Sequence, residues 1–140
     1  MSSVEVEYLD LDDVVMLATA LLGDPPPIRD LGLLAAAVAR PSASAFGDDA
    51  YLDLWSKAAA LLDSIVNNHA LVDGNKRLGW IACAVFLDLN GIDPTIATND
   101  GVVELVMRVA SESVALDEIA QGLRALIKGT EGSADPAGSR

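Results

Sequence analysis

A short polar run, His69 to Arg77 (HALVDGNKR), holds the residue types of this chain that are best suited to chemistry. His69 is the only histidine among 140 residues and can exchange a proton near neutral pH. Asp73 is a carboxylate that can hold Mg²⁺ together with phosphate oxygens. Lys76 and Arg77 place two cations side by side. A base, a metal ligand and adjacent cations are typical of a site that transfers a phosphate group.

The helix predicted after this run would present the same residues at its N-terminus. Asn75 begins the helix, so the unpaired N–H groups of its first turn point back toward Asp73 and Gly74. A glycine before a helix N-terminus lets the backbone approach an anion closely. Taken one by one, these residues fit an ordinary turn, a helix cap, solvated cations and a structural histidine equally well. Their location favours a site, because a helix that is apolar from Leu78 to Leu87 should not begin with solvated charges unless it opens into a cleft.

Hydrophobic spacing and capping residues predict that helices position this run. Six are expected: one after Asp10 or Asp12 that ends at GDPPP, one from Asp30 to Arg40, one from Asp48 or Asp49 to Asn68, one from Asn75 to Asn90, one capped by Thr98 or Asn99, and one from about Leu116 to Ile127. The helix from Asn75 is apolar on every face, so we expect it at the centre of the bundle.

Three further segments complete the predicted organisation. Val4 to Leu9 alternates apolar and acidic residues, which indicates a short strand or an extended arm. Pro41 to Asp49 reads as a polar, flexible loop, and Asp53, Lys57 and Asp63 as a solvated helix face. The sequence therefore predicts a single all-α domain over residues 1–128, with room for a minor strand or hairpin. A small, polar tail over residues 129–140 is expected to be disordered.

Composition supports this class and excludes others. Apolar residues make up 51 % of the chain and aromatic residues 4 %, so the core must be aliphatic, which suits packed helices. Nine cationic and 21 acidic residues give a formal charge of 9 − 21 = −12, which argues against direct nucleic-acid binding. One cysteine, Cys83, excludes an internal disulfide and favours a reducing cytoplasm, where we expect it as a small buried hydrophobe. No secretory signal is recognised, and the longest apolar run is too short to span a membrane.

The run resembles the motif of the Fic/Doc superfamily, His-Pro-Phe-x-(Asp/Glu)-Gly-Asn-Gly-Arg-x-x-Arg. This chain reads His69-Ala70-Leu71-Val72-Asp73-Gly74-Asn75-Lys76-Arg77-Leu78-Gly79-Trp80. The resemblance covers roughly residues 6 to 127 and includes YLDLDDV, GDPPPIRDLGLLAAAVARP and FLDLNGI. Four positions depart from the Fic pattern: Ala70, Leu71, Lys76 and Trp80. Lys76 and the missing second arginine resemble the Doc (death-on-curing) toxin branch, whereas Gly74 is the Fic-like choice.

The resemblance implies an all-α fold and an activity. Doc transfers the γ-phosphoryl of ATP to a threonine hydroxyl of translation elongation factor Tu, which stops protein synthesis. By this resemblance, His69 is the general base and Asp73 holds Mg²⁺ or orients the site. Gly74, Asn75, Lys76 and Arg77 lie where the family binds the phosphates. The family also implies a partner antitoxin that packs into a groove on the bundle, and a target-docking flap from Pro41 to Asp49.

Three functions remain open from the sequence. The first is the Doc-type kinase, and the second is a Fic-type adenylyltransferase that transfers AMP to a hydroxyl. Lys76 and Trp80 favour the first. The third is a catalytically inert helical module that binds a partner, which the departures at Ala70 and Leu71 allow. The sequence does not specify the target protein, the antitoxin or the oligomeric state.

Overall fold

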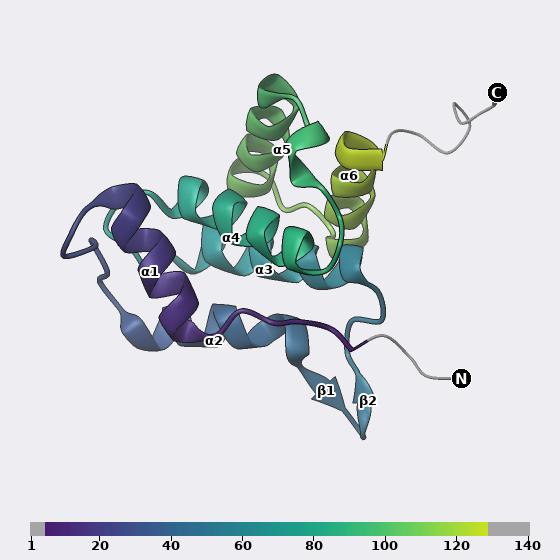
Figure 1. Ribbon diagram of the computed structural model, residues 1–140, viewed down its shortest axis with the longest axis horizontal. Helices are drawn as coiled ribbons and strands as arrows, with labels where there is room; N and C mark the ends of the chain where they lie inside the picture. The colour runs from purple at the N-terminus through teal and green to yellow at the C-terminus, as the bar shows by residue number, and fades with distance from the viewer. Residues whose placement is uncertain (1–4, 129–140) are drawn as a thin grey trace, which may run out of the picture.

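The computed structural model describes residues 5–128, and in that range it is a bundle of helices (Figure 1). The helices are α1 (Leu11–Leu22), α2 (Leu31–Ala39), α3 (Leu54–Asn68), α4 (Asn75–Leu89), α5 (Asn99–Ser111) and α6 (Leu116–Lys128). Two 3₁₀ turns span Arg40–Ser42 and Pro94–Ile96, and strands β1 (Ser44–Ala45) and β2 (Asp48–Asp49) form an antiparallel hairpin. The all-α prediction is therefore confirmed. The tail expected to be disordered, residues 129–140, lies outside the described residues.

Three helices, α1, α2 and α5, begin at a capping residue that the sequence predicted. The Asp10 carboxylate accepts a hydrogen bond from the Asp13 N–H at 2.8 Å, and the Asp13 carboxylate accepts one from the Asp10 N–H at 2.9 Å. This reciprocal pair is a capping box at the start of α1. Asp30 accepts from the Leu33 N–H at 3.0 Å, and Thr98 caps α5 in the same way. Each bond satisfies an N–H group that the first helical turn leaves unpaired.

The predicted start of the third helix is wrong. Asp48 and Asp49 belong to β2, and α3 begins at Leu54, where Asp53 is the cap and accepts from the Ser56 N–H at 2.7 Å. The cause is the turn at 46–47, where two residues with positive φ (55° and 85°) close a hairpin and draw the two aspartates into its second strand. The hairpin also replaces the flexible loop expected from Pro41 to Asp49.

The N-terminal segment is an extended arm, which is one of its two predicted forms. From residue 5 to residue 10 it has no strand partner. The Asn90 side-chain amide forms two hydrogen bonds with the backbone of Glu7. The Glu7 N–H donates to Asn90 Oδ1 at 2.9 Å, and Asn90 Nδ2 donates to the Glu7 carbonyl at 2.9 Å. The arm is thereby attached to the end of α4.

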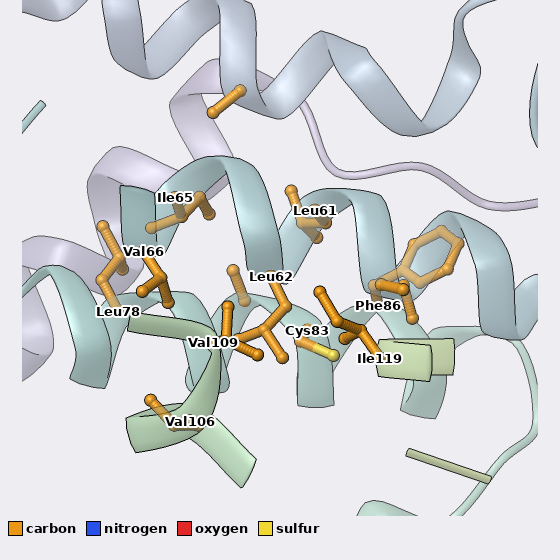
Figure 2. Packing of buried hydrophobic residues seen from close by; sticks show 14 of the residues in the cluster. Leu61, Leu62, Ile65, Val66, Leu78, Cys83, Phe86, Val106, Val109 and Ile119 are labelled. Atoms are coloured by element: carbon orange, nitrogen blue, oxygen red, sulfur yellow. The ribbon is translucent and has the colours of Figure 1, made fainter. Parts of the chain in front are cut away.

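Helices α3 and α4 pack against each other at the centre of the bundle, and α1, α2, α5 and α6 surround them. Figure 2 shows aliphatic side chains of α3, including Leu62, beside Cys83 of α4, with Ile119 of α6 on the other side of Cys83. The predicted central position of α4 is confirmed, although α3 shares it and Trp80 remains half-buried. Burial raises the pKa of the Cys83 thiol to about 12, so Cys83 is the buried hydrophobe that we expected.

Lys57 corrects the predicted solvated face of α3. Its side chain is only 2 % exposed, and its ammonium group forms an ion pair with Asp49 at 3.2 Å. The same ammonium lies 5.5 Å from the centre of the Tyr8 ring. The hairpin and the N-terminal arm cover this face, a tertiary arrangement that helical periodicity does not reveal. No helix in residues 5–128 has the length and apolar character needed to cross a membrane.

Candidate active site

His69 ends α3 in a strained backbone conformation. Its φ is 56° and its ψ is 41°, which is the left-handed region that residues other than glycine rarely adopt. The Arg29 guanidinium donates a hydrogen bond to the His69 carbonyl and so holds this turn from outside α3. The imidazole itself is exposed to solvent. A strained residue fixed by a distant side chain is typical of a functional position.

The segment before α2 fixes the loop that follows His69. The Ala70 carbonyl accepts hydrogen bonds from the backbone N–H groups of Arg29 and Asp30, at 2.8 and 3.0 Å. The Val72 N–H donates to the Pro27 carbonyl at 2.9 Å. These long-range backbone bonds orient the loop against the end of the GDPPP segment.

Ala70 and Leu71, two of the departures from the Fic pattern, are buried in the core, with 1 % and 2 % of their surface exposed. Leu71 forms an antiparallel bridge with Ile28. The Leu71 N–H donates to Asn75 Oδ1 at 3.1 Å, and Asn75 Nδ2 donates to the Leu71 carbonyl at 3.1 Å. Both polar ends of the Asn75 side chain are therefore engaged within the loop. Asn75, which the sequence predicted to bind phosphate, holds the backbone of the loop at Leu71 through these two hydrogen bonds.

Gly74 starts α4 with a backbone that favours glycine. Its φ is 91°, and a Cβ atom built there would lie 2.7 Å from both Cδ atoms of Leu22. No side chain caps the first turn of α4. The N–H groups of that turn are therefore available to a ligand, with the positive end of the helix dipole behind them.

All six predicted site residues line one pocket of about 360 Å³. They are His69, Asp73, Gly74, Asn75, Lys76 and Arg77, and the remaining lining residues are Val66, Val72 and Ala110. Ala110 comes from α5, so no local sequence signal indicated it. Arg29 was also missed, because its contact with the His69 carbonyl joins residues 40 positions apart.

The charged groups of this pocket favour an anionic ligand. Asp73, Lys76 and Arg77 are exposed, and within residues 5–128 neither cation forms an ion pair. The described part of the chain contains no group of three His, Cys, Asp or Glu side chains that could hold a metal by itself. One carboxylate is sufficient for Mg²⁺ when phosphate groups supply further oxygens, so Asp73 fits that role.

The hairpin does not lie beside this pocket. It precedes the N-terminus of α3, whereas His69 follows the C-terminus, and a helix of 15 residues is about 22 Å long. Figure 1 shows the hairpin at the end of α3 where that helix begins, and His69 follows the other end. The expectation that Pro41 to Asp49 forms the target-docking flap is therefore wrong in its location. The segment next to the loop is the one before α2, which bonds to Ala70 and Val72.

Comparison with known proteins identifies the family of this chain. Residues 8–87, which include α1 to α3, the whole loop and most of α4, match the Fic/DOC family. The chain belongs to the Fic/DOC family. It is also 48 % identical over 118 residues to the protein named Toxin Doc from Mycolicibacterium smegmatis (strain ATCC 700084 / mc(2)155), an alignment that covers 84 % of this chain and 91 % of that protein. The resemblance inferred from the motif is thus confirmed, and the residues matched to the family include the run from His69 to Arg77 that lines the pocket.

Proposed function

We propose that this chain is a Doc-like toxin that transfers the γ-phosphoryl of ATP to a Thr or Ser hydroxyl of a translation factor of the elongation factor Tu type. Members of the Fic/DOC family are transferases, which agrees with a pocket built for an anionic substrate. The observation that carries the proposal is the convergence of His69, Asp73, Lys76 and Arg77 on that pocket, in a chain 48 % identical to a protein named Toxin Doc.

The pocket supplies each part that phosphoryl transfer needs. His69 accepts the proton of the target hydroxyl, whose oxygen forms a bond to the γ-phosphorus. The bond from that phosphorus to the β,γ-bridging oxygen breaks, and ADP leaves. Lys76, Arg77 and the N–H groups at the start of α4 bind the phosphate oxygens and stabilise their charge. Asp73 would hold Mg²⁺, which supplies further positive charge to those oxygens.

The orientation of the nucleotide follows from two residues of α4. Lys76 and Trp80 occupy positions where the Fic pattern has glycine and arginine, and Trp80 contributes no charge to hold terminal phosphates. We therefore place the γ-phosphoryl, rather than the α-phosphorus, beside His69. The adenylyltransferase remains the second candidate because Gly74, with its φ of 91°, is the Fic-like residue at its position.

A toxin of this type requires a partner that silences it. The name of the Mycolicibacterium relative motivates a cognate antitoxin protein as that partner. We place the reaction in the cytoplasm, where translation takes place. The formal charge of −12 argues that any DNA contact of the pair belongs to the antitoxin.

The proposed function is tested by cell-free translation. Purified chain added with ATP is expected to stop synthesis of a reporter protein, and the folded His69→Ala variant is expected to leave synthesis intact. Glu104→Ala, an exposed change on α5 that does not line the pocket, serves as the control and should stop synthesis like the wild type. Inhibition by His69→Ala equal to that of the wild type would contradict the assignment, as would unimpaired synthesis with the wild type.

A further inference from the structure

A second, apolar pocket adjoins the proposed phosphate site. It has a volume of about 290 Å³ and lies between α4 and α5. Its apolar lining includes Trp80 and Ile81 of α4 and Val102 and Val106 of α5. This volume is just below the roughly 300–1,000 Å³ that ligand pockets span.

The two pockets share a boundary. Lys76 and Arg77 line both the polar pocket that contains His69 and the apolar pocket that contains Trp80. Trp80 lies four residues after Lys76 and three after Arg77, so its side chain is the neighbour of both cations on the surface of α4, about 6 Å from the first and about 4.5 Å from the second along the helix axis. A ligand that occupies both pockets must therefore have an anionic part and an apolar part close together.

A nucleoside triphosphate has this construction, with a charged triphosphate at one end and a flat aromatic base at the other. We propose that the apolar pocket receives the adenine base of ATP and that the Trp80 indole stacks on it. This inference rests on the proposed function, and it makes Trp80 a specificity-determining residue. The triphosphate would lie over Lys76 and Arg77, and the base would lie one helical turn further along α4.

The exposure of the pocket supports an occupant. Trp80 is half-buried, while Val103 and Met107 on the facing side of α5 are 60 % and 49 % exposed. A base inserted here would cover apolar surface that water otherwise contacts. The two cations at one end favour a ligand that carries negative charge, which a nucleotide supplies and a purely apolar segment does not.

Binding measurements with two ligands separate the base from the phosphates. Calorimetry compares the affinities for Mg·ATP and for Mg·tripolyphosphate, which lacks the base. Trp80→Leu is expected to weaken ATP binding about ten-fold, in line with the stacking of a base on an aromatic ring, and to leave tripolyphosphate binding unchanged. Trp55→Phe, a change to the only other tryptophan, which lies outside the apolar pocket, should alter neither affinity.

Fluorescence supplies a readout that does not depend on a damaging change at Trp80. In the Trp55→Phe background, emission from Trp80 is expected to be quenched by ATP and not by tripolyphosphate. Unchanged ATP affinity in Trp80→Leu, or equal losses for both ligands, would overturn the inference. Wild-type chain that binds neither ligand would overturn the proposed function as well, so the two failures are distinguishable.

Discussion

Gly74 and Gly47 share a left-handed backbone but differ in their surroundings. Their φ angles are +91° and +85°, and a Cβ atom would clash with Leu22 at the first and meet nothing within 4 Å at the second. Gly47→Ala should therefore lower the free energy of unfolding by about 1 kcal/mol through backbone strain alone. Gly74→Ala should lower it by about 2–3 kcal/mol, because Leu22 must also move. Urea denaturation of the two variants measures the difference, and equal losses would show that the Leu22 contact contributes nothing.

Asn75 and Asn99 provide a matched pair, since each is the first residue of its helix. Asn75→Asp keeps the acceptor for the Leu71 N–H but loses the donor to the Leu71 carbonyl and places a carboxylate beside it. We expect the free energy of unfolding to fall by about 1–2 kcal/mol, after the favourable charge at the helix N-terminus is counted. Asn99→Asp gains the same charge on an exposed residue and should change stability by less than about 0.5 kcal/mol. Chemical denaturation measures the free energy of unfolding of both variants. Equal changes in Asn75→Asp and Asn99→Asp would contradict the loop-shaping role of Asn75.

That the candidate site residues lie together was predictable because the motif is contiguous in sequence. His69, Asp73 and the two cations lie within nine positions, and a loop that short must gather them at one place. The contact from Arg29 to His69 was not predictable, because only the tertiary fold joins these residues. The two hydrogen bonds between the Asn75 side chain and the Leu71 backbone were missed for another reason. The sequence shows an amide side chain at a helix start but does not show which groups it binds.

At the scale of elements, Lys57 connects α3 to the hairpin and to the N-terminal arm. Burial lowers the pKa of the Lys57 ammonium, but Tyr8 and Asp49 together outweigh it, and the net shift is upward. A raised folded-state pKa stabilises the fold at pH values below the ordinary lysine pKa of about 10.4. That stabilisation is lost as the pH rises through the raised value.

The wild type should consequently lose stability on going from about pH 9.5 to 11.5 more steeply than Lys57→Met, whose side chain does not titrate. Thermal denaturation across this range measures both slopes. Asp49→Asn keeps the lysine and removes its anionic partner, and its slope should lie between the other two. Parallel slopes for the wild type and Lys57→Met would contradict the assigned role of Lys57.

Helix starts were predictable where a capping residue stands directly before an apolar pattern, as at Asp30. For the fifth helix the sequence allowed Thr98 or Asn99, and Thr98 is the cap. The start of α3 was not predictable, because several aspartates precede it and each one is an acceptable cap. In the structure, residues 48–49 pair in strand β2 of the hairpin, so they do not cap the helix. The turn of the hairpin carries Phe46 at a φ of 55°, a conformation that the side chain does not favour and that sequence preference does not indicate.

At the scale of the molecule, the aliphatic composition predicted packed helices, and the residues labelled in the core in Figure 2 are aliphatic apart from Cys83 and Phe86. The way the helices surround α3 and α4 did not follow from composition, because any amphipathic helix can pack on several neighbours. The position of the hairpin at the end of α3 remote from His69 was likewise visible only in the fold.

The acidic character of the chain gives a prediction for the whole fold. With a formal charge of −12, repulsion between like charges opposes the compact state. Raising sodium chloride from about 0.01 to 1 M shortens the screening length from about 30 to 3 Å and should raise the midpoint of thermal unfolding by several degrees. Calorimetry over a salt series tests this, and a midpoint that falls with salt would show that ion pairs such as Arg40–Asp63, at 2.9 Å, dominate instead.

The most direct test of the proposed reaction uses ATP labelled at either the γ- or the α-phosphate. The purified chain is incubated with elongation factor Tu, Mg²⁺ and one labelled ATP, beside His69→Ala and the Glu104→Ala control. We predict that the γ-label alone reaches the protein target, that His69→Ala abolishes transfer and that Glu104→Ala retains it. Transfer of the α-label would contradict this account and identify an adenylyltransferase, and transfer of neither label would contradict both enzymes.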